Sequence, residues 1–205
     1  MTGTRTRGWW EEYREFLPVG LLDLAEVEHH ATYVRVANMV PIPGLLQTTE
    51  HARVVFSAGI PQLAPYEVEH RVSHRIKRQA ILHGDTPTRL TAIIHEAALH
   101  MGYGSSTVVR GQLQHLIDMG ERENITIVVI PFGAGPLPGS RQSVDYLGGS
   151  VPQLDTVQLD SDHGNQLLDA EAHLVNYRSV LDRMESYALK PKASRDLIYR
   201  IAQSI

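Results

Sequence analysis

The first part of the chain has the hydrophobic pattern of helices. Between residues 9 and 39 the apolar positions recur every three or four residues, which places them on one face of a helix. Pro18 divides this stretch into two helices, because proline disrupts a helix interior. Residues 47–57 and 65–82 show the same periodicity and predict two further helices.

The middle of the chain changes to the pattern of strands. Residues 89–94 and 124–131 are compact runs rich in β-branched side chains, which favour extended backbone. Residues 143–147 and 156–160 are shorter and predict two more strands. A helical periodicity over residues 106–121 separates the first two strands.

Two predicted helices, over residues 169–187 and 194–203, close the chain. Helices therefore come first, a small sheet follows and helices return, an order typical of the α+β class. We expect N-terminal helices, a small mixed β-sheet and C-terminal helices around one core. A chain of 205 residues is long enough for one such domain, spanning residues 1–205, and short for two.

Composition narrows the functions that the chain can have. The formal net charge is −4, which disfavours nucleic-acid binding as the main activity, because such binding depends on Lys and Arg neutralising phosphates. The chain has no cysteine, so disulfides, thiolate metal sites and a cysteine nucleophile are excluded. No apolar run is long enough to cross a membrane or to form a secretory signal. We expect a cytoplasmic protein without membrane contact.

Histidine pairs are the candidates for a metal site. His95 and His100 resemble a zinc-protease pair but lie five residues apart, which at about 100° per residue points them in different directions on a helix. His70 and His74 have the required spacing of four, yet no third ligand is indicated. Motifs for phosphate loops, dinucleotides and serine hydrolases are absent as well. We therefore expect no metal and no cofactor.

The densest basic cluster lies in the predicted helix of residues 65–82. Arg71, Arg75 and Arg78 are three or four residues apart and so share one side of that helix. Two interpretations stay open at this point. The cluster forms an ion-pair network on the helix surface, with Glu67 as one partner, or it binds an anionic ligand.

Four segments, in this order, resemble a known family. The first is Val-Pro-Ile-Pro-Gly-Leu-Leu-Gln-Thr over residues 40–48, and the second is Arg-Val-Ser-His-Arg-Ile-Lys-Arg-Gln over residues 71–79. Glu-Ala-Ala-Leu over residues 96–99 with Gln-Leu-Gln-His-Leu over 112–116, and Asn-Ile-Thr-Ile-Val-Val-Ile-Pro over 124–131, complete the set. They resemble the actinobacterial domain DUF5753, found in Scr1-type, antitoxin-like regulators, and the resemblance covers essentially the whole chain.

The resemblance implies a sensor. In that family the domain usually follows an N-terminal helix-turn-helix DNA reader and senses a ligand or a partner protein. Here about eight residues precede Trp9, whereas a helix-turn-helix needs on the order of fifty residues to form a core. We expect no DNA-binding domain in this chain and no direct contact with nucleic acid.

Several residues depart from the family pattern by adding polar or titratable side chains. They include His29, His95 and Asp160, with Gln158 on the same predicted strand as Asp160. Burial and neighbouring charges can tune the pKa of titratable groups toward neutrality. Such groups in an apolar cleft are suited to proton transfer.

The first functional hypothesis follows from these departures. A stand-alone small-molecule-binding domain acts as a cofactor-independent acid–base isomerase or epimerase on a small secondary metabolite, for example a cyclic dipeptide. The candidate catalytic residues are His95 with Glu96, or His29 with Glu28. Arg75 or Gln79 would polarise a carbonyl oxygen. The candidate substrate-binding residues are Tyr33, Arg71, Arg75, Gln79, Gln158 and Asp160.

The second hypothesis keeps the family role. The domain senses a metabolite or binds a partner protein in a transcriptional regulatory or toxin–antitoxin-like system, and another chain contacts the DNA. A small-molecule ligand is a partner in both hypotheses, and a homodimer or a partner protein is compatible with either. The hypotheses differ in whether the bound molecule is chemically changed.

Overall fold

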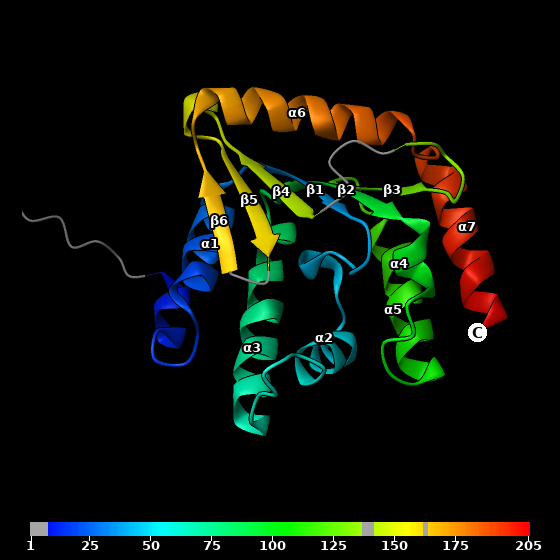
Figure 1. Ribbon diagram of the computed structural model, residues 1–205, viewed down its shortest axis with the longest axis horizontal. Helices are drawn as coiled ribbons and strands as arrows, with labels where there is room; N and C mark the ends of the chain where they lie inside the picture. Colours follow the sequence, from blue (N-terminus) through cyan, green and yellow to red (C-terminus); the bar gives the residue numbers. More distant parts are fainter. Residues whose placement is uncertain (1–7, 137–141, 162–163) are drawn as a thin grey trace, which may run out of the picture.

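The computed structural model of the protein describes residues 8–136, 142–161 and 164–205 (Figure 1). The α-helices are α1 (Val19–His30), α2 (Thr49–Ser57), α3 (Pro65–Arg78), α4 (Glu96–His100), α5 (Ser106–Met119), α6 (Glu171–Ser186) and α7 (Pro191–Ser204). The strands are β1 (Tyr33–Asn38), β2 (Arg89–His95), β3 (Ile125–Ile130), β4 (Ser143–Gly148), β5 (Thr156–Ser161) and β6 (Gly164–Leu168). Short 3-10 helices are η1 (Trp9–Tyr13), η2 (Gly44–Leu46), η3 (Gln79–Leu82) and η4 (Pro152–Leu154).

All six described strands join one mixed sheet in the order β3-β2-β1-β4-β5-β6. Strands β1, β2 and β3 are parallel, whereas β4, β5 and β6 are each antiparallel to their neighbours. The strand order reverses at β1, because β2 and β4 lie on its two sides. In open α/β sheets ligands bind at the carboxyl ends of parallel strands, next to such a reversal. We call this end of β1, β2 and β3 the carboxyl edge.

Helices cover both faces of the sheet. Figure 1 shows α6 alone across one face, while α1, α3, α5 and the other helices lie on the opposite side. Side chains alternate between the two faces along each strand. On β1, Val34 and Val36 therefore enter the main core under the larger helical layer, whereas Ala37 joins a second cluster that packs against α6.

The α+β class is confirmed, but two elements of the sheet differ from the sequence-based expectation. Residues 33–38 form the central strand β1, although the helical pattern was expected to run on to residue 39. The reason is that Val34 and Val36 alternate with Tyr33 and Arg35, and this short period-two stretch directly follows α1. Edge strand β6 was not predicted, because its side chains are largely exposed and give it little hydrophobic pattern.

No helix in the described part of the chain is long and apolar enough to cross a membrane. The longest of them, α6, has 16 residues, whereas a membrane span needs about 20 apolar residues.

Candidate functional site

The loop between β1 and α2 carries the first of the family segments. Leu45 and Leu46 are buried in the main core, which fixes the loop against the helical layer. The side chain of Gln47 is buried too, and its Nε2 donates to the carbonyl oxygen of Ile42 at 2.7 Å. Thr48 then caps α2 by accepting a hydrogen bond from the backbone N–H of His51.

The second family segment, on α3, binds this loop directly. Arg75 Nη1 donates to Oε1 of Gln47 at 2.7 Å, and Gln79 Nε2 donates to the backbone oxygen of Gln47 at 2.7 Å. An added Cβ at Gly44 would lie 3.4 Å from three atoms of the Arg75 side chain. The Arg75 side chain therefore lies directly against the backbone of Gly44.

A third family segment completes the contact from α5. Gln112 is buried, its Nε2 donates to the backbone oxygen of Leu46 at 2.7 Å, and its Oε1 accepts from the backbone N–H of Thr48 at 2.8 Å. The side chain thus satisfies two backbone groups that have no partner in a regular element. The segments on which the family resemblance rests, at residues 40–48, 71–79 and 112–116, meet around one loop.

A buried ion pair links α1 to α3 beside this loop. Arg78 Nε and Nη2 donate to the two carboxylate oxygens of Glu28 at 2.7 and 2.6 Å. The side chains of Arg78 and Glu28 are only 5% and 2% exposed. Two parallel hydrogen bonds in a dry environment hold both groups in fixed positions.

Strands β4 and β5 bring further polar groups to the same side of the sheet. Asp145 pairs in register with Val36 of β1 and with Gln158 of β5, so its side chain lies on the face that carries Val36. Asp160 lies two residues beyond Gln158, on that same face and opposite Ser143. Gln158 is buried, whereas Asp145 is half-buried and Asp160 is exposed.

The surroundings change the proton affinity of Asp145. Burial, and after it the negative charge of Glu28, raises the pKa of Asp145 to about 7, against the opposing effect of Arg78. A carboxyl group with such a pKa is present in both protonation states near neutral pH. This is the property that a general acid or base requires.

Arg75 faces the same acidic groups. Burial and the neighbouring Arg78 lower the pKa of Arg75 to about 10, while Asp160 and Asp145 act in the opposite direction. Its Nε is buried and has no hydrogen-bond partner among the described residues. The residue as a whole is half-buried.

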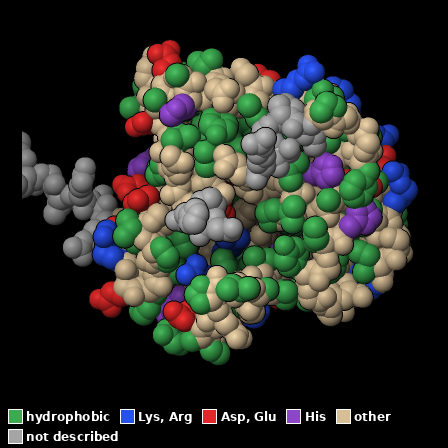
Figure 2. Space-filling view, in the orientation of Figure 1, with side chains coloured by type: hydrophobic (Ala, Val, Ile, Leu, Met, Phe, Trp, Pro, Cys, Tyr) green, Lys and Arg blue, Asp and Glu red, His purple; other side chains and the backbone are tan. Residues whose placement is uncertain are grey.

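We call the group of charged side chains formed by Glu28, Arg75, Arg78, Asp145 and Asp160 the charged cleft. Figure 2, in the orientation of Figure 1, shows a hollow near the middle of this face, below the sheet and between α3 and α4. Basic side chains are visible on one side of the hollow, and hydrophobic side chains form the opposite wall. A cleft with an apolar wall and a few convergent polar groups is the usual form of a small-molecule site.

The chemistry available in the charged cleft is acid–base chemistry. Asp145 can accept or donate a proton, and the fixed charges of Arg75 and Arg78 can stabilise negative charge on a ligand oxygen. No group of three or more histidine, aspartate or glutamate side chains placed to hold a metal occurs among residues 8–136, 142–161 and 164–205.

The predicted pair His95 and Glu96 lies at the end of β2, where both side chains hold local structure. His95 is the N-cap of α4, and its Nδ1 accepts from the backbone N–H of Ala97 at 3.2 Å. Glu96 Oε2 accepts from the backbone N–H of Phe132 at 2.7 Å, and its Oε1 lies 3.6 Å from Nε2 of His100. We call this group, including Phe132, the His95 corner.

His29 and Tyr33 lie away from the charged cleft. His29 is exposed, packs against Trp10 at a ring-centroid distance of 5.2 Å and borders a separate cavity of about 640 Å³. Tyr33 donates from its hydroxyl to Oδ2 of Asp155 at 2.9 Å, and Tyr146 donates to the same oxygen at 2.8 Å. Because Tyr146 belongs to the cluster under α6, this group lies on the other face of the sheet.

Arg71 is half-buried and has no ion pair among the described residues. Glu67, its expected partner, instead accepts from the backbone N–H of Ala64 at 2.7 Å at the start of α3. The three arginines of the basic cluster thus have different environments, and only Arg78 forms an ion pair in this part of the structure.

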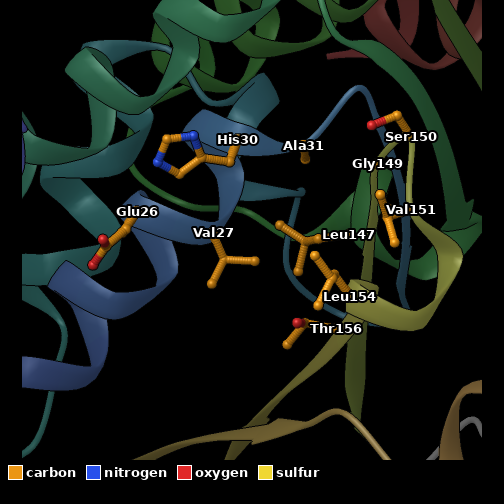
Figure 3. A pocket seen from close by; sticks show the side chains of 11 residues that line it. Glu26, Val27, His30, Ala31, Leu147, Gly149, Ser150, Val151, Leu154 and Thr156 are labelled. Carbon is orange, nitrogen blue, oxygen red and sulfur yellow. The ribbon is translucent and has the colours of Figure 1, made fainter. Parts of the chain in front are cut away.

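A second cavity of about 290 Å³ lies between α1 and the start of β5. Figure 3 shows Glu26, Val27 and His30 of α1 on one side and Leu147, Val151 and Leu154 on the other. Its lining is mostly apolar, and Leu154 is 77% exposed. Because the lining of this cavity is mostly apolar, we place the candidate chemistry in the charged cleft.

The sequence reasoning found some residues of the charged cleft and missed others. Glu28, Arg75, Gln79, Gln158 and Asp160 were predicted, and the structure brings them to one region. The sequence places Arg78 in a basic cluster without a separate role, and no motif or spacing selects Asp145. The alternation of residues 143–147 predicts that Asp145 lies on one face of a strand. It does not show which groups from other elements lie near that face.

The fold and the cleft define an α+β domain whose polar site lies at the carboxyl edge of three parallel strands. The chain belongs to the family described as "Domain of unknown function (DUF5753)", which matches residues 21–200. The resemblance drawn from the four segments is thereby confirmed. No curated protein and no solved structure matches the chain.

Proposed function

We propose that the protein binds a small carbonyl-containing metabolite in the charged cleft and moves a proton on it as a cofactor-independent isomerase or epimerase. One observation carries this proposal. Asp145 is half-buried, burial and the charge of Glu28 raise its pKa to about 7, and the positive charges of Arg78 and Arg75 lie near enough to oppose that shift. A cyclic dipeptide is a suitable substrate because each of its α-carbons lies next to an amide carbonyl.

The proposed reaction breaks one C–H bond and forms another. The carboxylate of Asp145 removes the proton from the carbon beside the carbonyl, and the electron pair moves onto the carbonyl oxygen. Arg75 stabilises the negative charge on that oxygen. When a proton returns to the carbon from the opposite side, the electron pair moves back and the configuration is inverted.

Asp160 is the second acid in this scheme. It lies diagonally from Asp145 on neighbouring antiparallel strands, since Gln158 is the direct partner of Asp145. Diagonal positions are about 7–8 Å apart, a separation that leaves room for a small ring between the two carboxyl groups. Asp160 is exposed, so it can exchange its proton with water after each turnover.

The test is hydrogen exchange in heavy water. The purified protein is incubated in D2O with cyclo(L-Phe-L-Phe) and cyclo(L-Leu-L-Leu), and mass spectrometry and chiral chromatography report deuterium at carbon and the change of configuration. We expect incorporation with the native chain, and a loss of it in Asp145→Asn. Glu96→Gln is the matched control, because Glu96 is also a carboxylate at the carboxyl edge.

Two results would overturn this proposal. Absence of exchange with either probe removes the proposed chemistry. Equal exchange by Asp145→Asn and the native chain removes Asp145 from it.

Ligand sensing is the second candidate function. It is favoured by the fact that several cleft groups already bind one another, namely Glu28 with Arg78 and Gln47 with Arg75. Groups held in this way form a preformed polar surface that recognises a ligand without reacting with it. Retention of a probe by the protein without exchange at carbon would make sensing the working function, in a regulatory or toxin–antitoxin-like system.

A further inference from the structure

We propose that the protein has a second small-molecule site, at the opposite edge of the sheet from the charged cleft, which binds a small hydrophobic amine. The site consists of the two cavities beside α1, of about 290 and about 640 Å³. We call it the amine site. It is independent of the proposed function, because no residue of the charged cleft lines either cavity.

The two cavities meet at the carboxyl end of α1. His30 and Ala31, the last residue of the helix and the residue after it, line both of them. Val27 and the connection between β4 and β5 enclose the smaller cavity (Figure 3). The larger cavity lies between Trp9 and residues 80–88, which lead into β2. Because β1 and β2 begin here, the amine site lies opposite the carboxyl edge.

Hydrogen bonds hold the walls of the amine site in place. Thr88 Oγ1 donates to the carbonyl oxygen of Ala31 at 3.0 Å. The backbone N–H of Thr32 donates to the carbonyl oxygen of Gly148 at 2.8 Å, and that of Ala31 donates to the carbonyl oxygen of Glu28 at 3.1 Å. The end of α1 is thereby tied to β2 and β4, so the cavities are formed before a ligand binds, as in most small-molecule sites.

The charges on the cavity walls favour a cation. Apart from histidines, Glu26 is the only titratable side chain that lines either cavity among the described residues. Glu26 is exposed and has no ion-pair partner in the described part of the chain. The carboxyl end of a helix also carries partial negative charge, because its last carbonyl groups have no partner within the helix. An ammonium group is attracted by both, whereas a carboxylate is repelled.

Three imidazoles supply acceptors for the ammonium group. His29, His30 and His83 are exposed, line the larger cavity, and have no hydrogen-bond partner for their rings among the described residues. A neutral imidazole has one acceptor nitrogen, and an ammonium group has three N–H donors. His30 follows Glu26 by four residues on α1, so the two side chains lie on the same side of the helix. The ammonium group can therefore bind Glu26 and His30 together.

The smaller cavity suits the apolar part of the ligand. Figure 3 shows the side chains of Val27, Leu147 and Leu154 pointing toward one another across it. Leu154 is in contact with water over most of its surface. A phenyl ring or a branched alkyl chain placed against Leu154 removes apolar surface of both partners from water. The bound amine thus has its ammonium group at Glu26 and His30 and its apolar part in the smaller cavity.

Three molecules of nearly equal size test the preference for positive charge. Phenethylamine is a cation, 2-phenylethanol is neutral and phenylacetate is an anion. Each is titrated into the chain labelled with nitrogen-15 at pH 7.5, above the range in which imidazoles usually titrate. The backbone amide shifts report both the Kd and the place of binding. We expect saturable shifts at Val27, His30 and Leu154 with phenethylamine, about five-fold weaker binding of 2-phenylethanol, and still weaker binding of phenylacetate.

Two variants test the charged and the apolar part of the amine site separately. Glu26→Gln should weaken phenethylamine binding about five-fold, the effect of one exposed ion pair, and leave 2-phenylethanol binding unchanged. Leu154→Ala should weaken the binding of both molecules about ten-fold. Asp23→Asn is the matched control, because Asp23 is another exposed carboxylate of α1 that lines neither cavity. It should bind phenethylamine as the native chain does.

Several results would overturn the inference. They are the absence of a saturable shift with any of the three molecules, equal binding of all three, and stronger binding of phenylacetate, which would assign the histidines to an anion. Shifts around Asp145 in place of His30 would put the amine in the charged cleft. Equal losses in Glu26→Gln and Asp23→Asn would show only a general attraction to an acidic surface. Deuterium exchange with cyclic dipeptides tests the proposed chemistry at Asp145 separately.

Discussion

The charged cleft and the His95 corner lie at the same edge of the sheet, and both combine acidic and basic side chains. In the His95 corner, His95 and Glu96 are neighbours in sequence, and each is bound to a backbone N–H. In the charged cleft, Asp145 and Arg75 are seventy positions apart in the chain and lie close enough to affect each other's proton affinity.

The difference between the two regions is one of hydrogen bonding and burial. Carboxylate and imidazole groups that accept bonds from backbone N–H groups act as caps and anchors. Asp145 has a raised pKa, and Arg75 Nε has no partner among the described residues. A pair of titratable residues adjacent in sequence is thus weaker evidence for catalysis than a buried titratable group facing an unpaired donor.

Removing one carboxylate from each region is the most direct test of this difference. Asp145→Asn should lower the exchange rate by about 10²–10⁴-fold, the usual contribution of a general acid or base. Glu96→Gln keeps an oxygen that can accept from Phe132 and should retain the native rate. The measurement is deuterium incorporation per unit time, with circular dichroism to verify folding, and a larger loss in Glu96→Gln would reverse the assignment.

We expect the loss of a carboxylate to lower the free energy of unfolding more in the charged cleft than in the His95 corner. Glu28→Ala leaves the guanidinium of Arg78 buried without its partner, which costs about 3–5 kcal/mol. Glu96→Ala removes the acceptor of the Phe132 backbone N–H, which can bind water instead. We expect the free energy of unfolding to fall by about 1 kcal/mol. Urea unfolding followed by fluorescence measures both values, and the double variant Glu28→Leu with Arg78→Met should recover much of the loss.

We expect the titration of Asp145 to make the free energy of unfolding depend on pH. Its pKa is raised from 3.8 to about 7 by folding, so the folded state binds its proton more tightly than the unfolded state. This contribution is fully present below about pH 4 and is lost as the pH rises through 7. Asp145→Asn should therefore be the more stable protein at pH 8, by on the order of a few kcal/mol.

For His51 and His74 we expect the opposite trend, a loss of stability as the pH falls. Folding lowers their pKa values from 6.5 to about 4 and about 3, so the unfolded state binds their protons more tightly. Their contribution is present above pH 6.5 and is lost as the pH falls through 4. Thermal unfolding of the native chain and of Asp145→Asn from pH 4 to 8 separates the two trends, and identical profiles for both proteins would contradict the role given to Asp145.

The smallest effect is expected at His95. His95→Ala removes the N-cap of α4 and should cost about 1 kcal/mol, whereas His95→Asn supplies a preferred cap and should be nearly neutral. Both variants should exchange deuterium at the native rate. A drop of orders of magnitude in His95→Asn, with the fold retained, would place His95 in the reaction.

Much of the fold could be predicted from periodicity. Helix α5 and strands β2 and β3 were predicted within a few residues because their patterns are long and uniform. Strand β1 was missed although it is central, since six residues after a helix carry little periodic signal. The family segments could also be found in the sequence. The sequence did not show that Gln47, Arg75 and Gln112 meet around one loop.

The sequence by itself determined most of the elements, the α+β class and the family of this protein, because these depend on local periodicity and on motifs read in order. Only the tertiary structure decided which titratable groups share a cleft. The strand register places Asp145 on the face of the sheet that is covered by the layer containing α1 and α3, and the packing of α1 on α3 buries Glu28 and Arg78 near it. The pKa of a carboxyl group depends on burial and on nearby charges in space, and neither can be deduced from its neighbours along the chain.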